Sequence, residues 1–288
     1  MFFANARFRL CELFGIPLYL DPSLGLLLLF FALGGGGLGA GLVCAAMLLA
    51  SVTLHELGHA LTARAFGYQT RDITLSLLGG CASLIALPRK ASQEFLTAVA
   101  GPAASFALAC AGTLLVALLS ENSGVADAFL FVAEETLSSF GLSVSLGASL
   151  YVRPDNYELL SFLLYFTLMN TMLGAFNLLP GFPLDGGRVF RSAMRRFMTR
   201  VEATRIAMIV GRAVAVLIGL RGAWNLLHGG NWGFVTIMIA WMIWKEGMRE
   251  YRMALQESAW DRGWFSARVS PPPYGGKSEE AEIERNRT

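Results

Sequence analysis

The chain has 288 residues, of which 55% are hydrophobic and only 15% are charged, and its formal net charge is +2. A soluble domain usually carries about 25% charged residues, so this composition excludes an ordinary soluble protein, and the small net charge gives no indication of nucleic acid binding. Several uncharged runs are longer than 20 residues, which predicts an α-helical polytopic protein in a lipid bilayer.

The chain begins with a short basic segment, residues 1–12, which we expect on the cytosolic side, and an extended stretch at 13–21. No small-residue cleavage site follows the first apolar run, so we expect a retained membrane segment. The predicted spanning helices cover residues 22–38, 40–66, 92–119, 158–179, 203–221 and 231–248. The sequence therefore predicts a six-span domain over 1–252 and a polar, cytosolic, partly disordered tail at 253–288.

The second predicted span carries the run His55-Glu56-Leu57-Gly58-His59. Two histidines four residues apart lie on one face of a helix, where both imidazoles can bind one metal ion. Glu56 projects about 100° away from His55, from where it can act on a water molecule without being a ligand. This pattern indicates a zinc hydrolase with one Zn²⁺, a third ligand from elsewhere and a carboxylate as general base. A packed core histidine is the simpler alternative, but two histidines at this spacing fit it poorly.

Residues 67–90 differ from the long apolar runs around them. Small and β-branched residues alternate with apolar ones over 73–85, and Gly79-Gly80 is the expected turn. We predict a small β-hairpin at the membrane boundary, whose edge could pair with an extended peptide. An ordinary interhelical loop is the alternative.

The segment 121–156 is acidic and contains a mostly apolar stretch, 128–151, for which a surface helix is one interpretation. The four cysteines form no Cys-x-x-Cys pair. We interpret them as small buried hydrophobic residues and not as a disulfide framework or a thiolate zinc site.

Asp185 is the candidate for the third metal ligand, because it is the only charged residue between Leu159 and Gly187. Pro180 and Pro183 prevent a continuous helix there, so the carboxylate would sit at a broken helix end facing a cavity. Aspartate also caps helices well, and the Arg-rich segment that follows offers a helix to cap. Spacing alone leaves both roles open.

Lysine and arginine cluster after the second span, after the fourth span and at the start of the tail. With six spans, these clusters fall on one side, which predicts that both termini are cytosolic. His228, the remaining histidine, then lies on the opposite side and is a poor candidate ligand.

These residues together resemble the site-2 proteases, which are membrane-embedded zinc metalloproteases. The resemblance rests on the His55–His59 motif and on the run Asn177-x-x-Pro180-x-x-Pro183-Leu-Asp185-Gly-Gly. Between them, Ala100-Gly101-Pro102-Ala103-Ala104-Ser105 resembles a Gly-Pro element of that family, with serine at position 105 where the family often has asparagine. The chain looks like the compact six-span form without a PDZ or CBS domain, from a bacterial or archaeal cell membrane.

The resemblance implies that His55, His59 and Asp185 bind one Zn²⁺ and that Glu56 is the general base. It also implies that Asn177 helps to hold the substrate or its developing oxyanion, although an amide that caps the broken fourth helix is the alternative. The implied activity is hydrolysis of a peptide bond in or near the transmembrane segment of a membrane-protein substrate. A metal-ion transporter and an inactive helix-binding homologue are the two competing hypotheses. Substrate identity and oligomeric state are not indicated.

Overall fold

The computed structural model describes residues 7–25, 37–76, 79–85, 88, 90–120, 124–139, 145, 157–229 and 233–261. They form two compact units. The first contains the chain up to His59 together with 71–83 and 100–176, and the second contains 60–70, 84–99 and the chain from Asn177 onward. Helices α2 (Gly37–Ala65) and α3 (Ala91–Leu119) each contribute residues to both units.

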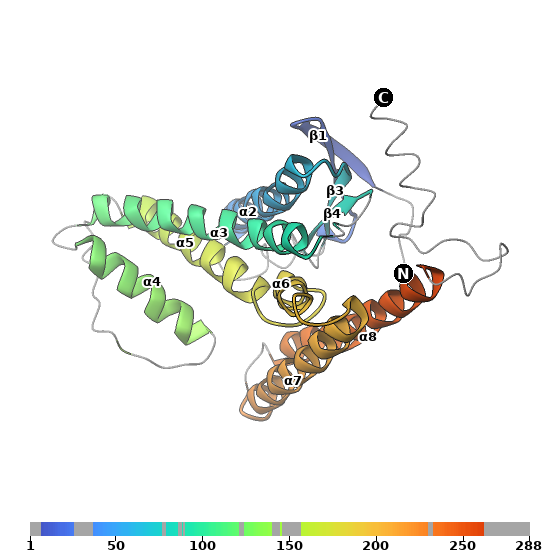
Figure 1. Ribbon diagram of the computed structural model, residues 1–288. Helices are drawn as coiled ribbons and strands as arrows, with labels where there is room; N and C mark the ends of the chain where they lie inside the picture. Colours follow the sequence, from blue (N-terminus) through green and yellow to red (C-terminus); the bar gives the residue numbers. More distant parts are fainter. Residues whose placement is uncertain are drawn as a thin grey trace. The chain divides into compact units, whose positions relative to one another are not determined.

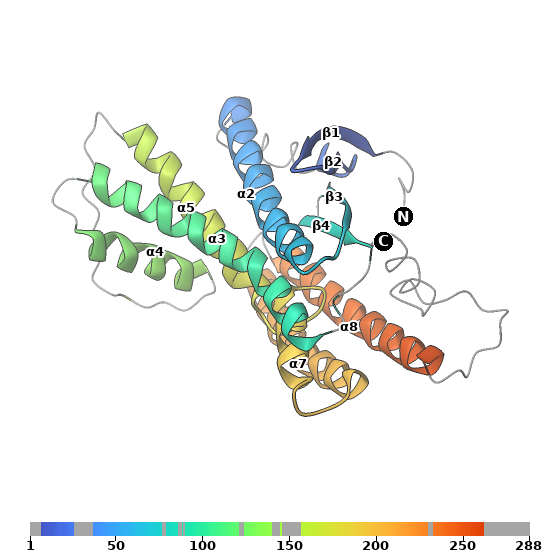
Figure 2. The ribbon, with the colours of Figure 1, turned by 45° about the horizontal axis from the view of Figure 1, so that its top comes forward.

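A four-stranded sheet of order β1-β2-β3-β4 belongs almost entirely to the first unit (Figure 2). Its strands are β1 (Phe8–Leu13), β2 (Ile16–Leu20), β3 (Thr70–Ser76) and β4 (Gly79–Leu84). The first two strands form an antiparallel hairpin, and β2 and β3 pair in parallel. Successive side chains of a strand point to opposite faces of the sheet. One face is buried, and its residues Ile16, Leu18, Ile73 and Leu75 are each at most 3% exposed.

The hairpin predicted at 73–85 is confirmed as β3 and β4, but its expected turn is wrong. Gly79 and Gly80 open strand β4, and residues 77–78, which connect the two strands, lie outside the described residues. A glycine within a strand often stands where another group approaches the backbone closely. At Gly80 this group is the side chain of Glu56, which occupies the space where a Cβ atom would lie. The pairing of β1 with β2 was not predicted.

Three helices of the first unit pack around one buried apolar cluster. Helix α3 lies beside α4 (Val125–Ser139) and α5 (Tyr157–Asn177), as both views show (Figures 1 and 2). Val116, Ala117, Ala128 and Leu160 form a buried cluster between these three helices. Helix α4 therefore covers part of the apolar stretch predicted at 128–151, and packs onto α3 and α5.

The second unit contains the short helix α6 (Asp185–Met194) and an antiparallel pair, α7 (Arg200–Leu227) and α8 (Gly233–Asp261), which Figure 1 shows side by side. Thr199 and Glu202 form a capping box at the start of α7. Helix α8 continues to Asp261, so residues 253–261, which were expected in the tail, are helical. The rest of the predicted tail lies outside the described residues.

Four of the described helices are long and apolar enough to cross a membrane: Gly41–Ala65, Ala91–Leu119, Glu158–Asn177 and Arg200–Leu227. They correspond to the second, third, fourth and fifth predicted spans. Most of the first predicted span lies outside the described residues. Helix α8 matches the sixth but carries charged residues from Lys245 onward and is not among the four. A polytopic membrane fold is thus supported, and the number six stays a prediction.

The structure exposes the side chains of Cys11, Cys81 and Cys110, so the expectation that the cysteines are buried is wrong for these three. No disulfide bond joins any of the four cysteines.

Candidate metal centre

The two histidines of the motif lie on consecutive turns of α2 and are both buried, with 2% of His55 and 5% of His59 exposed. Their Nε2 atoms are 3.3 Å apart. Two nitrogen ligands at about 2.0–2.1 Å from a tetrahedral zinc ion lie about 3.3–3.4 Å apart. The spacing of the two imidazoles therefore fits one zinc ion.

The other side of the His55 ring is held by Ser105 on α3. The distance from His55 Nδ1 to Ser105 Oγ is 2.9 Å. If Nδ1 carries the proton and donates it to this hydroxyl, Nε2 is unprotonated and its lone pair can serve as a metal ligand. Serine at position 105 thus supplies the orienting partner, a contact that the sequence motif alone did not predict.

Gly101 brings the backbone of α3 directly against both imidazoles. A Cβ atom added there would lie 2.7 Å from His55 Nε2 and closer still to His59 Nε2. Any side chain at position 101 would therefore occupy the space between the two imidazole Nε2 atoms and α3. This explains why a glycine stands in the interior of this helix, where it weakens helix formation by about 1 kcal/mol relative to alanine.

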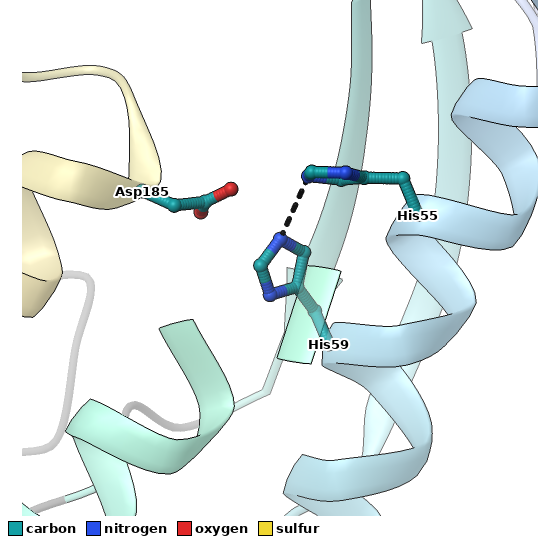
Figure 3. Close-up of side chains that lie close together, drawn as sticks. All are labelled: His55, His59 and Asp185. Atoms are coloured by element: carbon teal, nitrogen blue, oxygen red, sulfur yellow. Dashed lines mark hydrogen bonds between the residues drawn. The ribbon is translucent and has the colours of Figure 1, made fainter. Parts of the chain in front are cut away.

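Asp185 is the first residue of α6 and is buried, with 7% exposed. Ligand atoms of His55, His59 and Asp185 all lie within 4.8 Å of one another (Figure 3). Among the residues that the structure describes, no other group of three His, Cys, Asp or Glu side chains gathers in this way. The alternative role as an N-cap is wrong, because the N-cap is Leu184 and makes no side-chain cap bond.

Two imidazoles and one carboxylate are a donor set typical of catalytic zinc sites, which leave the fourth position open to water or substrate. The three residues could therefore hold one zinc ion, as the sequence predicts.

Glu56 is 9% exposed and interacts with strand β4. The backbone N–H of Ala82 donates a hydrogen bond of 2.9 Å to Glu56 Oε2. A Cβ atom on Gly80 would lie 2.9 Å from Glu56 Oε1, so β4 approaches the carboxylate as closely as a glycine allows. The sequence predicted the hairpin and the glutamate separately but not this contact, for which Gly79-Gly80 was the available signal.

The two remaining candidate residues differ in position. Asn177 is the last residue of α5 and is half-buried. His228 is exposed at the C-terminal end of α7, where its Nδ1 lies 2.9 Å from the carbonyl oxygen of Trp224. His228 is thus not part of the cluster, as expected.

Comparison with known proteins identifies relatives over most of the chain. The family model described as Peptidase family M50 matches residues 43–218. A Synechocystis protein named as a candidate zinc metalloprotease is 34% identical over 84% of this chain and 59% of its own length. A zinc metalloprotease of Methanocaldococcus jannaschii is 28% identical over 76% of this chain and 54% of its own length. The chain thus spans between half and three fifths of the length of these relatives.

The solved structure of the site-2 protease from Methanocaldococcus jannaschii shares the fold. The match has a TM-score of 0.56 at 24% sequence identity and covers 86% of this chain and 96% of that chain. The resemblance to the site-2 proteases is therefore confirmed at the level of fold. Because the family model matches more than half of the residues, the chain belongs to peptidase family M50.

Proposed function

We propose that this protein is an intramembrane zinc metalloprotease that hydrolyses a peptide bond in or near the transmembrane segment of a membrane-protein substrate. The observation that carries the proposal is the pair of buried imidazole nitrogens 3.3 Å apart, with an aspartate ligand atom within 4.8 Å of both. In this proposal His55, His59 and Asp185 hold the metal, and Glu56 is the catalytic base.

A bound zinc ion would lower the pKa of the hydrolytic water and polarise the carbonyl of the scissile bond. Glu56 is next to a metal ligand in sequence but points to β4, which leaves its carboxylate outside the donor set. From there it can take a proton from the attacking water and deliver it to the nitrogen of the leaving amine. The low exposure of Glu56 restricts access of bulk water to these proton transfers.

A substrate strand would pair with β4. Within the described part of the sheet β4 has a neighbour, β3, on one side only, so its other edge can accept an extended peptide. The Ala82 N–H already contacts Glu56, so a peptide along this strand would run beside the proposed base. A helical substrate hides its carbonyl groups in hydrogen bonds and must unwind locally before it can pair in this way.

We assign Asn177 a role in holding the substrate backbone or the developing oxyanion. The position of Asn177 at the end of α5 suits either this role or a cap of the broken helix. Substitution to alanine separates the two roles, because loss of a cap lowers the melting temperature, whereas loss of a substrate contact lowers the rate of hydrolysis alone.

A metal-ion transporter is the competing hypothesis from another functional class. It needs a succession of ligand groups along a path across the bilayer, and the described residues contain a single candidate group. An inactive homologue would be expected to have a damaged motif, yet all four residues of the proposed centre are present in the sequence. The clusters of lysine and arginine further support cytosolic termini.

The test is a Glu56→Gln variant, which keeps the size of the side chain and removes the base. We expect one zinc ion per chain, as in the wild type, and no cleavage of membrane peptides in cells that express the variant. Glu158→Gln, at an exposed glutamate in the first turn of α5, is the matched control and should cleave normally. Cleavage by Glu56→Gln at the wild-type rate would refute the assignment of the base.

The same pair of strains can identify substrates. Membrane peptides that accumulate with Glu56→Gln and disappear with the wild type and with Glu158→Gln are candidate substrates. If no peptide differs between the strains, the proposed activity is contradicted.

A further inference from the structure

A buried network of charged side chains connects α6 with α3 and α8 inside the second unit. Arg191 on α6 is 2% exposed and Glu94 on α3 is 3% exposed. Arg191 Nε donates a hydrogen bond of 2.8 Å to Glu94 Oε1, and Arg191 Nη1 donates one of 2.9 Å to Glu250 Oε2 on α8. Arg195 Nη1 lies 2.6 Å from the second oxygen of Glu94. Arg191 of α6 and Arg195, the C-cap residue of α6, thus contact both oxygens of Glu94.

Such a network determines geometry because burying any of its charges alone is very unfavourable. Burial by itself would lower the pKa of Arg191, but the carboxylates of Glu94 and Glu250 outweigh this effect and raise that pKa above its ordinary value. The guanidinium also lies over the ring of Phe182, 4.9 Å from its centroid. The guanidinium of Arg191 is planar and contacts Glu94, Glu250 and the ring of Phe182 in three fixed directions. These contacts leave α6 little freedom to rotate or to move along its axis.

Helix α6 needs an external anchor. It has ten residues, two of them glycines in the first turn, and its N-cap Leu184 makes no side-chain cap bond. A helix of this length is only marginally stable by itself. Gly186 and Gly187 let its first turn approach the preceding loop, since a Cβ atom on Gly187 would lie 2.8 Å from the backbone nitrogen of Phe182. Packing against this loop does not connect α6 with α3 or α8, but Arg191 does.

We propose that Arg191 is a positioning residue for the metal centre: through Glu94 and Glu250 it holds α6 so that Asp185 is directed to the metal. The proposal rests on the proposed function of Asp185 as a ligand. Asp185 opens the helix, and Arg191 follows six residues later in the same rigid element. Glu94, its principal partner, lies on the helix that also carries Ser105 and Gly101, which contact the imidazoles.

The experiment measures metal binding and not only hydrolysis. Purified protein in detergent is loaded with Co²⁺, whose visible spectrum depends on the number and type of its ligands, and affinities for Co²⁺ and Zn²⁺ are measured by competition with a chelator. We expect Arg191→Met to bind both ions at least about tenfold more weakly. Its cobalt spectrum should match that of Asp185→Asn, in which the carboxylate ligand itself is changed. Arg191→Lys, which keeps the charge without the fork, should recover part of the affinity.

The control is Thr199→Ala. It removes the capping box at the start of α7, where Thr199 Oγ1 accepts a hydrogen bond from the backbone N–H of Glu202, and it changes no charge near Glu94. This variant should keep the wild-type cobalt spectrum and affinity even if it melts at a lower temperature. A loss of stability without a change in the metal site is therefore distinguished from a loss of positioning.

A wild-type spectrum and affinity in Arg191→Met would overturn the proposal. If that variant does not fold, Glu250→Gln provides the same test, because Glu250 is 28% exposed and its replacement leaves the pair with Glu94 intact. We expect weaker metal binding in it also, and unchanged binding would overturn the proposal. A wild-type protein that binds Zn²⁺ but cleaves no peptide would refute the proposed activity and leave the positioning role intact, whereas one that binds neither ion would overturn both.

Discussion

Replacing Gly101 by alanine tests how closely α3 covers the metal centre. The added Cβ would lie 2.7 Å from His55 Nε2, and ordinary contacts with a Cβ atom begin at 3.4 Å. The nitrogen must therefore move by about 0.7 Å (3.4 − 2.7), and His59 Nε2 must move further. Zinc–ligand distances tolerate deviations of only about 0.2 Å. We expect the zinc affinity of Gly101→Ala to fall by at least about tenfold, although alanine is the better helix former.

The assay is the zinc-to-protein ratio after equilibration with a chelator, together with the melting temperature. Gly112→Ala is the matched control, because Gly112 lies on the same helix as Gly101 but its added Cβ would meet Thr167 Oγ1 on α5, away from the histidines. Overpacking costs about 1–3 kcal/mol, so both variants should melt at a lower temperature. Only Gly101→Ala should lose zinc. Wild-type zinc affinity in that variant would refute the close contact between α3 and the imidazoles.

Three further predictions follow from the contacts of the centre. Ser105→Ala removes the 2.9 Å contact with His55 Nδ1 and should weaken zinc binding about 10- to 100-fold, as measured by competition with a chelator. Ser105→Asn should retain most of the zinc affinity. Equal affinities of the wild type, Ser105→Ala and Ser105→Asn would contradict an orienting role of Ser105. Gly80→Ala places a Cβ atom against the side chain of Glu56, so it should slow hydrolysis and leave the zinc content unchanged. A loss of zinc in this variant would contradict the assignment of separate roles to Glu56 as base and to the three metal ligands. Stripping the zinc should lower the melting temperature, because an ion that binds the folded state alone stabilises it, and adding Zn²⁺ back should restore it.

The parts of the molecule that depend on local sequence could be predicted. The bounds of α2, α3 and α5 differ from the predicted spans by at most three residues, because long apolar runs and terminating glycines or prolines determine them. The proximity of His55 and His59 follows from the helical period alone. Even the end of α5 at Asn177 follows from Pro180, which disfavours a helical residue before it.

The contacts between distant segments could not be predicted in the same way. Ser105 lies 50 residues from His55, and Ala82 lies 26 residues from Glu56. No periodicity connects such pairs, and a serine in an apolar helix is equally compatible with a bond to its own backbone. The strand pairing of β1 and β2 was missed because a short basic segment offered no clear alternation. The three clustered residues could thus be selected from the sequence, whereas the contacts that support them could not.

Helix α3 contributes no metal ligand, yet three of its residues contact the imidazoles or the helix that begins at Asp185. Glu94, Gly101 and Ser105 all lie on α3, within 11 residues or about 16 Å along its axis. Ser105 holds one imidazole, Gly101 limits the space beside both, and Glu94 pairs with the arginines of the helix that begins at Asp185. Since a helix is stiff over this length, a shift of α3 would disturb both imidazoles and the aspartate together. Retention of the ligand residues is therefore insufficient for metal binding, and a chain with the same ligands but a bulkier or uncharged α3 should bind zinc weakly.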